Sequence, residues 1–187
     1  MIATVTYTAA EALQKLKEGN ERYLTAKHSE GDISLLLRKK TCAEGQAPYA
    51  IVLTCSDSRV IPESIFSAGI GELFVIRVAG NVIDDHQLGS IEYAAEHLGS
   101  RLILVLGHNH CGAVDAAIHH DPAGYIKSIT DEIKLAIGGE TDDYKACCRN
   151  VRHSVKQIEE RLAFLRDEEY RVCGALYHLE DGRVEFL

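Results

Sequence analysis

The sequence predicts an α/β fold with a central, mostly parallel sheet that is flanked by helices. Polar residues or glycine bound three short apolar runs, as is typical of buried strands in a parallel sheet: Ala50–Leu53, Leu73–Val78 and Leu102–Leu106. Helical patterns separate these runs, and alternating strands and helices indicate parallel strands joined by right-handed crossovers. The 187 residues suit a single domain, residues 1–187, and no linker of biased composition divides them.

A helix is expected at the start of the chain. Thr8 and Glu11 have the spacing of a capping box, which marks where a helix begins. Apolar side chains then recur on one helical face: Ala9, Leu13, Leu16 and Tyr23. We expect this helix to reach about Lys27. The following stretch, Ser29–Pro48, mixes charges, glycine and a short leucine run, and predicts a connector with at most one helical turn.

Two helical patterns lie between the predicted strands. The first, Pro62–Ser67, is short. The second, Gln87–Leu98, places apolar residues on one face: Leu88, Ile91, Ala95 and Leu98. Gly99 can adopt the left-handed conformation that ends a helix, so it is the expected stop.

The second half of the chain is predominantly helical in pattern. The pattern begins at Gly112 and is broken near Pro122 and Gly138. A long amphipathic helix is expected from Asp143 to about Arg166, with apolar residues at intervals of four and three: Val151, Val155, Ile158, Leu162 and Leu165. Val172–Tyr177 and Val184–Phe186, joined around Asp181-Gly182, predict a closing β-hairpin.

Composition and charge restrict the compartment and the partners. The net charge of −8 argues against nucleic-acid binding, because a polyanion is repelled by an acidic surface. No apolar stretch approaches the roughly 20 residues of a membrane span, and Met1–Ala10 has no signal-peptide pattern. We therefore expect a cytoplasmic protein without a membrane partner. Its six cysteines are expected to remain thiols or to bind metal rather than form disulfides.

Two short motifs lie at the ends of the first and third predicted strands. Cys55, Asp57 and Arg59 form a Cys-x-Asp-x-Arg motif, and His108 and Cys111 form a His-x-x-Cys motif. Ligands of open α/β sheets bind beyond the carboxyl ends of the strands, so both motifs are expected at one rim. Thiolate and imidazole are the ligands that Zn²⁺ prefers, and three such ligands leave one tetrahedral position open, as catalytic zinc sites do.

Other interpretations of these residues are weaker. A single cysteine is more often a core residue than a ligand, and His-x-x-Cys alone is weak support for a metal. A structural zinc site needs a fourth ligand, and no further cysteine or histidine has a matching spacing. A phosphatase loop would need arginine where the chain has Ala117. The joint occurrence of both motifs therefore favours a zinc centre with Asp57 and Arg59 beside it, and His110 as a candidate proton shuttle.

With both motifs in place, the chain resembles the β-class carbonic anhydrases, whose zinc signature is Cys-x-Asp-x-Arg followed by His-x-x-Cys. The resemblance extends to Gly71–Asn81, Ser90–Ala94 and Gly174–Tyr177. It implies four parallel strands with an added antiparallel edge. It also implies that residues 1–47 form an N-terminal helical arm and connector, and that the chain assembles as a homodimer or homotetramer.

The resemblance also implies a chemistry. One Zn²⁺ per subunit, held by Cys55, His108 and Cys111, would support the reversible hydration of CO₂ to bicarbonate and a proton, with zinc-bound hydroxide attacking carbon. Asp57 would accept a hydrogen bond from the zinc-bound water while Arg59 keeps Asp57 off the metal. In an inactive state favoured at low pH, Asp57 could become the fourth ligand. A COS or CS₂ hydrolase on the same scaffold and a non-catalytic protein that binds zinc or bicarbonate remain the alternatives.

Two departures from the family pattern concern small-molecule binding. An allosteric subset carries tryptophan three residues before the first zinc cysteine, whereas this chain has Val52 there and no tryptophan. Inhibition by bicarbonate through such a site is therefore not expected. Plant-like members have a substrate-binding glutamine after the first motif, and Phe66–Gly71 contains none. Backbone N–H groups or another side chain must replace it, or the site is more apolar.

Overall fold

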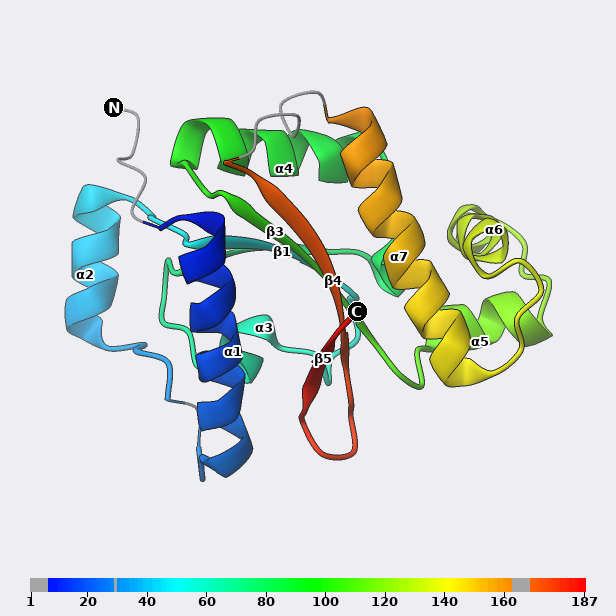
Figure 1. The fold of residues 1–187 in the computed structure, drawn as a ribbon, viewed down its shortest axis with the longest axis horizontal. Helices are drawn as coiled ribbons and strands as arrows, with labels where there is room; N and C mark the ends of the chain where they lie inside the picture. The colour runs from blue at the N-terminus through cyan, green and yellow to red at the C-terminus, as the bar shows by residue number, and fades with distance from the viewer. Residues whose placement is uncertain (1–6, 29, 163–168) are drawn as a thin grey trace.

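The computed structural model describes residues 7–28, 30–162 and 169–187 and confirms the α/β fold (Figure 1). The described strands form one sheet in the order β2-β1-β3-β4-β5. Their bounds are β1 Ala50–Thr54, β2 Leu73–Arg77, β3 Leu102–His108, β4 Arg171–Tyr177 and β5 Val184–Phe186. Strands β2, β1, β3 and β4 pair in parallel, and β5 pairs antiparallel with β4. The expected four parallel strands with an antiparallel edge are thus confirmed.

Helices cover both faces of this sheet because successive residues of each central strand point to opposite sides. Val52 and Leu104 belong to the cluster that includes buried side chains of α1 (Ala9–Thr25) and α3 (Pro62–Ile65). Leu53 and Val105 belong to the cluster that includes α4 (Asp85–Leu98) and α7 (Asp143–Arg161). Strand β1 is buried throughout and β3 likewise, which explains their continuous apolar runs.

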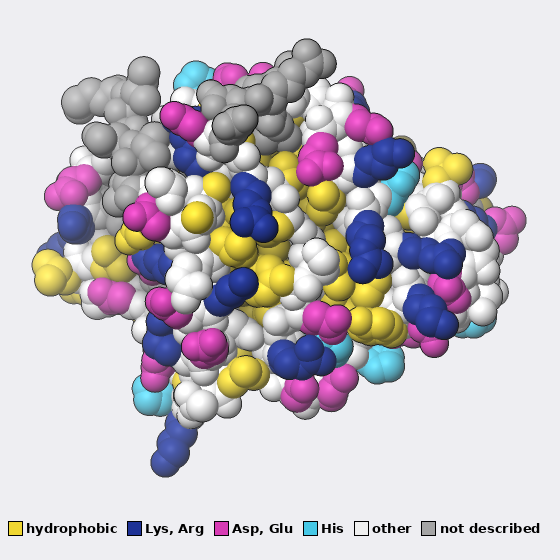
Figure 2. Space-filling model, viewed as in Figure 1, with side chains coloured by type: hydrophobic (Ala, Val, Ile, Leu, Met, Phe, Trp, Pro, Cys, Tyr) yellow, Lys and Arg dark blue, Asp and Glu magenta, His cyan; other side chains and the backbone are white. Residues whose placement is uncertain are grey.

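The remaining helices lie outside these two layers. Helices α5 (Gly112–His119) and α6 (Ile126–Ile137) contact each other and α7 close to where β3 ends (Figure 1). A short 3₁₀ turn, η1 (Ala79–Asn81), follows β2. On the face shown in Figure 2, hydrophobic side chains are visible between α1 and α7, near the β4–β5 edge of the sheet. No described helix is long and apolar enough to cross a membrane.

The predicted helix boundaries are confirmed where a cap specifies them. The Thr8 hydroxyl accepts a bond from the Glu11 N–H, and the Glu11 carboxylate accepts one from the Thr8 N–H. Helix α4 ends at Gly99, whose backbone is left-handed with φ 74°. The breaks around Pro122 and Gly138 separate α5, α6 and α7 as expected.

Two expectations were wrong. The stretch Ser29–Pro48 contains a ten-residue helix, α2 (Leu35–Glu44), rather than a connector with at most one turn. Ser34 caps this helix, but none of its residues is buried, so it lacks the apolar periodicity that identifies a packed helix. Helix α7 ends at Arg161, before the expected Arg166, because Leu162 leaves the helical conformation at φ −99° and ψ 104°. Leu165 lies outside the described residues.

Candidate metal centre

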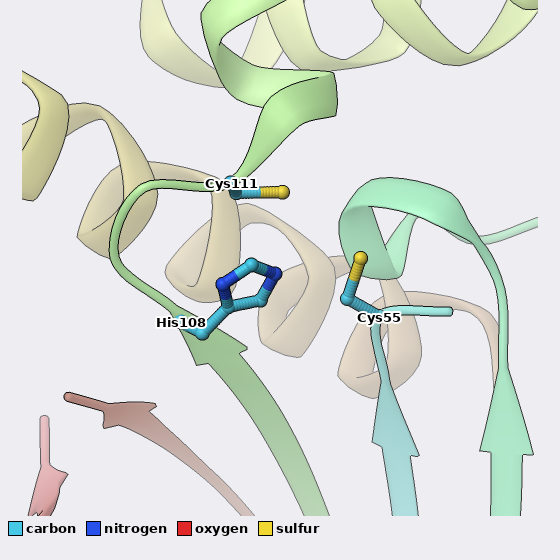
Figure 3. A group of neighbouring side chains, drawn as sticks. All are labelled: Cys55, His108 and Cys111. Carbon is cyan, nitrogen blue, oxygen red and sulfur yellow. The ribbon is translucent and has the colours of Figure 1, made fainter. Parts of the chain in front are cut away.

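The cysteine and histidine residues of the two motifs meet at one rim of the sheet. Cys55 directly follows β1, His108 is the last residue of β3, and Cys111 is the N-cap of α5. Because β1 and β3 are parallel neighbours, their carboxyl ends lie side by side. Figure 3 shows the three side chains pointing toward a common region.

The donor atoms fit a zinc ion. Each of the three residues offers one ligand atom, and these atoms all lie within 4.8 Å of one another. The residues are 5%, 1% and 2% exposed for Cys55, His108 and Cys111. His108 Nδ1 lies 2.8 Å from the Asn109 carbonyl oxygen, whereas its buried Nε2 has no hydrogen-bond partner within the described chain. A buried ring nitrogen that has no hydrogen-bond partner and lies beside two sulfur atoms is the arrangement that a metal ligand requires.

The two thiols of the site differ strongly in acidity. A hydrogen bond from Cys111 is the main cause that lowers the pKa of Cys55 to about 4, and N–H groups of Gly80 and Asp57 add to it. The same bond, together with burial, raises the pKa of Cys111 far above its usual range. Zinc binding requires both sulfurs as thiolates, so it would release the proton that the less acidic Cys111 thiol holds.

Asp57 and Arg59 form a close ion pair beside this group. Arg59 Nε donates to Asp57 Oδ1 at 3.0 Å, and Arg59 Nη2 donates to Asp57 Oδ2 at 2.7 Å. These bonds from Arg59 are the largest cause that holds the pKa of the Asp57 carboxyl well below its usual range. Asp57 Oδ2 also lies 3.8 Å from His108 Nε2, so this carboxylate faces the region where the donor atoms converge. All five predicted site residues are thus brought together.

The structure adds neighbours that the sequence reasoning missed. Arg77, at the end of β2, donates from Nε to the Cys55 carbonyl at 3.2 Å and from Nη2 to the Asp57 carbonyl at 2.7 Å. A basic residue at the end of a strand on the same rim was the available signal. The buried Asn109 donates to Glu180 at 2.7 Å and accepts from the Leu179 N–H at 2.9 Å. These bonds fix the loop between His108 and Cys111 to the β4–β5 hairpin.

His110, the candidate proton shuttle, lies at the exposed side of the motif. Its backbone is left-handed, with φ 52°, and its N–H donates to Asp143 Oδ2 at 2.9 Å. Its carbonyl accepts from Arg59 Nη2 at 3.2 Å. The side chain is 69% exposed and its Nδ1 lies 3.6 Å from Asp143 Oδ2. Its role in proton transfer stays a prediction.

Comparison with known proteins agrees with this geometry. The sequence profile of the carbonic anhydrase family matches residues 50–184. A carbonic anhydrase of Mycolicibacterium smegmatis is 35% identical over 93% of this chain and 91% of its own length. Carbonic anhydrase 2 of Mycobacterium tuberculosis is 37% identical over 92% of this chain and 90% of its own length. The crystal structure of a β-carbonic anhydrase of Aspergillus fumigatus has a TM-score of 0.72 at 26% identity, covering 95% of this chain and 89% of that one.

Proposed function

Because the chain belongs to the β-class carbonic anhydrases, a family of enzymes, we propose that it catalyses the reversible hydration of CO₂ to bicarbonate and a proton. The observation that carries this proposal is the position of Asp57. Its carboxylate faces the converging Cys55, His108 and Cys111 donors, and Arg59 holds it through two side-chain bonds. A purely structural zinc site has no use for a carboxylate held in that position.

Three residues of the site would bind the metal, and two would orient the reacting water. Cys55, His108 and Cys111 would hold one Zn²⁺ per subunit. When bound, zinc supplies a Lewis acid that lowers the pKa of water, so that hydroxide is available near neutral pH. Asp57 Oδ2 would accept a hydrogen bond from the reacting water and direct its lone pair toward CO₂. Arg59 would keep Asp57 in that role, because a permanently charged, planar guanidinium fixes both carboxylate oxygens.

The direct test is stopped-flow CO₂ hydration with purified, zinc-loaded protein, beside sulfide release from COS under the same conditions. We expect hydration far above the buffer background, and we expect it to disappear when a chelator removes the zinc and to return when zinc is restored. Hydration at background level with full zinc occupancy would contradict the proposal. Rapid sulfide release in that case would identify the COS hydrolase instead.

We further propose a cytoplasmic homodimer or homotetramer. Three large apolar side chains stand exposed around the start of α2: Ile33, Leu35 and Leu36 at 73%, 58% and 79%. Such a group at a helix none of whose residues is buried suits a contact with a second copy.

Sedimentation velocity tests the assembly. The full chain is expected to sediment as a dimer or tetramer, and Leu36→Glu is expected to shift it toward the monomer by placing a charge in the contact. Leu135→Glu is the matched control, because Leu135 is 74% exposed on α6. A parental protein that sediments as a monomer would refute the assembly, and a Leu36→Glu variant that sediments like the parental protein would place the contact elsewhere.

A further inference from the structure

The sulfur of Cys55 accepts a buried hydrogen bond from the backbone of the η1 turn. The donor is the Gly80 N–H, and the N···S distance is 3.3 Å. Gly80 and Asn81 both have left-handed backbones, with φ values of 68° and 46°. Left-handed φ is costly for a residue with a side chain and persists only where the surroundings enforce it. Some other part of the chain must therefore hold this turn.

Helix α7 supplies that support through two buried polar side chains. Asn150 Nδ2 donates to the Gly80 carbonyl at 2.7 Å, and Ser154 Oγ donates to the Asn81 carbonyl at 3.0 Å. The two residues are 2% and 1% exposed and lie four positions apart, on the same face of the helix. Both bonds end on the turn that donates to Cys55.

The turn cannot move freely in other directions. A side chain added at Gly80 would place its Cβ 2.7 Å from Ile133 Cδ1 of α6 and 3.1 Å from Ala113 Cβ of α5. The turn is thus confined between α5 and α6 on one side and tied to α7 on the other. The bonds from Asn150 and Ser154 hold the carbonyl groups of its two left-handed residues.

We propose that Asn150 and Ser154 are positioning residues of the metal centre, acting on Cys55 through the Gly80 N–H. This inference rests on the proposed function, because it takes Cys55 to be a metal ligand. An N–H donor stabilises the lone pairs of a thiolate and so sets how strongly the sulfur donates to the metal. Loss of the two side chains leaves the Gly80 and Asn81 carbonyls unpaired, and the N–H turns away from the sulfur.

If Asn150 and Ser154 only stabilised the fold, removing a comparable buried hydrogen bond elsewhere would have the same effect on the metal centre. The chain offers a matched control for this comparison. Ser100 is also 1% exposed, and its Oγ donates to the Pro48 carbonyl at 2.7 Å. These residues precede β3 and β1, at the end of the sheet opposite to the metal centre. Ser154→Ala and Ser100→Ala therefore each remove one buried hydroxyl bond to a distant carbonyl, but only the first bond ends on the η1 turn.

The experiment loads the full chain with Co²⁺ and records the thiolate-to-metal charge-transfer band. In Ser154→Ala, and more in the double variant with Asn150→Ala, the band is expected to shift to longer wavelength. With zinc, CO₂ hydration is expected to fall by roughly tenfold in the double variant, since partners beyond the direct ligands commonly contribute 10- to 100-fold. Ser100→Ala is expected to leave both readouts unchanged.

The outcomes separate this inference from the proposed function. A band in Ser154→Ala and in the double variant that coincides with the band of Ser100→Ala would overturn the positioning role. If the double variant does not fold, the single Ser154→Ala variant decides. The band can be read whether or not the parental protein hydrates CO₂, so a shift without any parental activity would contradict the proposed function and leave the positioning role intact.

Discussion

Replacement of Cys55 by serine or of His108 by alanine is expected to abolish metal binding and, with it, CO₂ hydration. Both residues are buried and each supplies one of the three converging donor atoms, so either substitution leaves two of these donors. A site with two protein ligands holds zinc weakly, and the zinc content should fall from about one ion per chain to below roughly a tenth. Atomic absorption after gel filtration measures this content.

Cys173→Ser is the control for the cysteine substitution. Cys173 lies in β4, half-buried and outside the metal centre, so the variant changes the same atoms elsewhere in the sheet. It is expected to retain zinc and activity. Full zinc occupancy in Cys55→Ser would show that the ion binds elsewhere, whereas a loss of zinc in Cys173→Ser as well would indicate that damage to the fold is the cause.

Asp57→Ala is expected to retain zinc and to lose most CO₂ hydration, by about 10²- to 10⁴-fold in kcat. Asp57 is not needed to hold the metal in the proposed arrangement, because Cys55, His108 and Cys111 supply the protein ligands and Arg59 holds the Asp57 carboxylate beside them. Its expected contribution is to accept the hydrogen bond that orients the reacting water. Stopped-flow hydration at matched zinc content measures the loss.

Asp115→Ala provides the comparison for this variant. Asp115 is an exposed carboxylate on α5, and its side chain pairs with His119. Its backbone N–H donates to the Cys111 carbonyl at 2.9 Å, and alanine retains this bond. It is expected to keep parental turnover. Parental turnover in Asp57→Ala would refute the orienting role, and loss of zinc in that variant would mean that Asp57 is itself a ligand.

The sequence predicted the fold best where a residue pattern has a single structural meaning, such as a helix cap, a helix stop or a buried strand. The capping box at Thr8, the stop at Gly99 and the apolar runs of β1 and β3 each predicted an element that the structure confirms. Helix α2 was not predicted because none of its residues is buried, and an apolar periodicity identifies only helices that pack a face into the core. The early end of α7 was not predicted because the apolar pattern continues past the end of the helix. Leu162 is apolar and buried, as the pattern requires, but its backbone has already left the helix.

For the candidate site, the sequence by itself determined the donor residues and their common rim. Thiolate, imidazole, carboxylate and guanidinium have distinct chemistries, and parallel strands that alternate with helices bring their ends together. The tertiary structure alone decided what surrounds those donors. Arg77, Asn150 and Ser154 act on backbone atoms of the site from distant parts of the chain. Arg77 at least ends a strand at the same rim, which is a sequence signal. Any polar residue at the right point in space could make the bonds of Asn150 and Ser154, so no residue type or spacing predicts them.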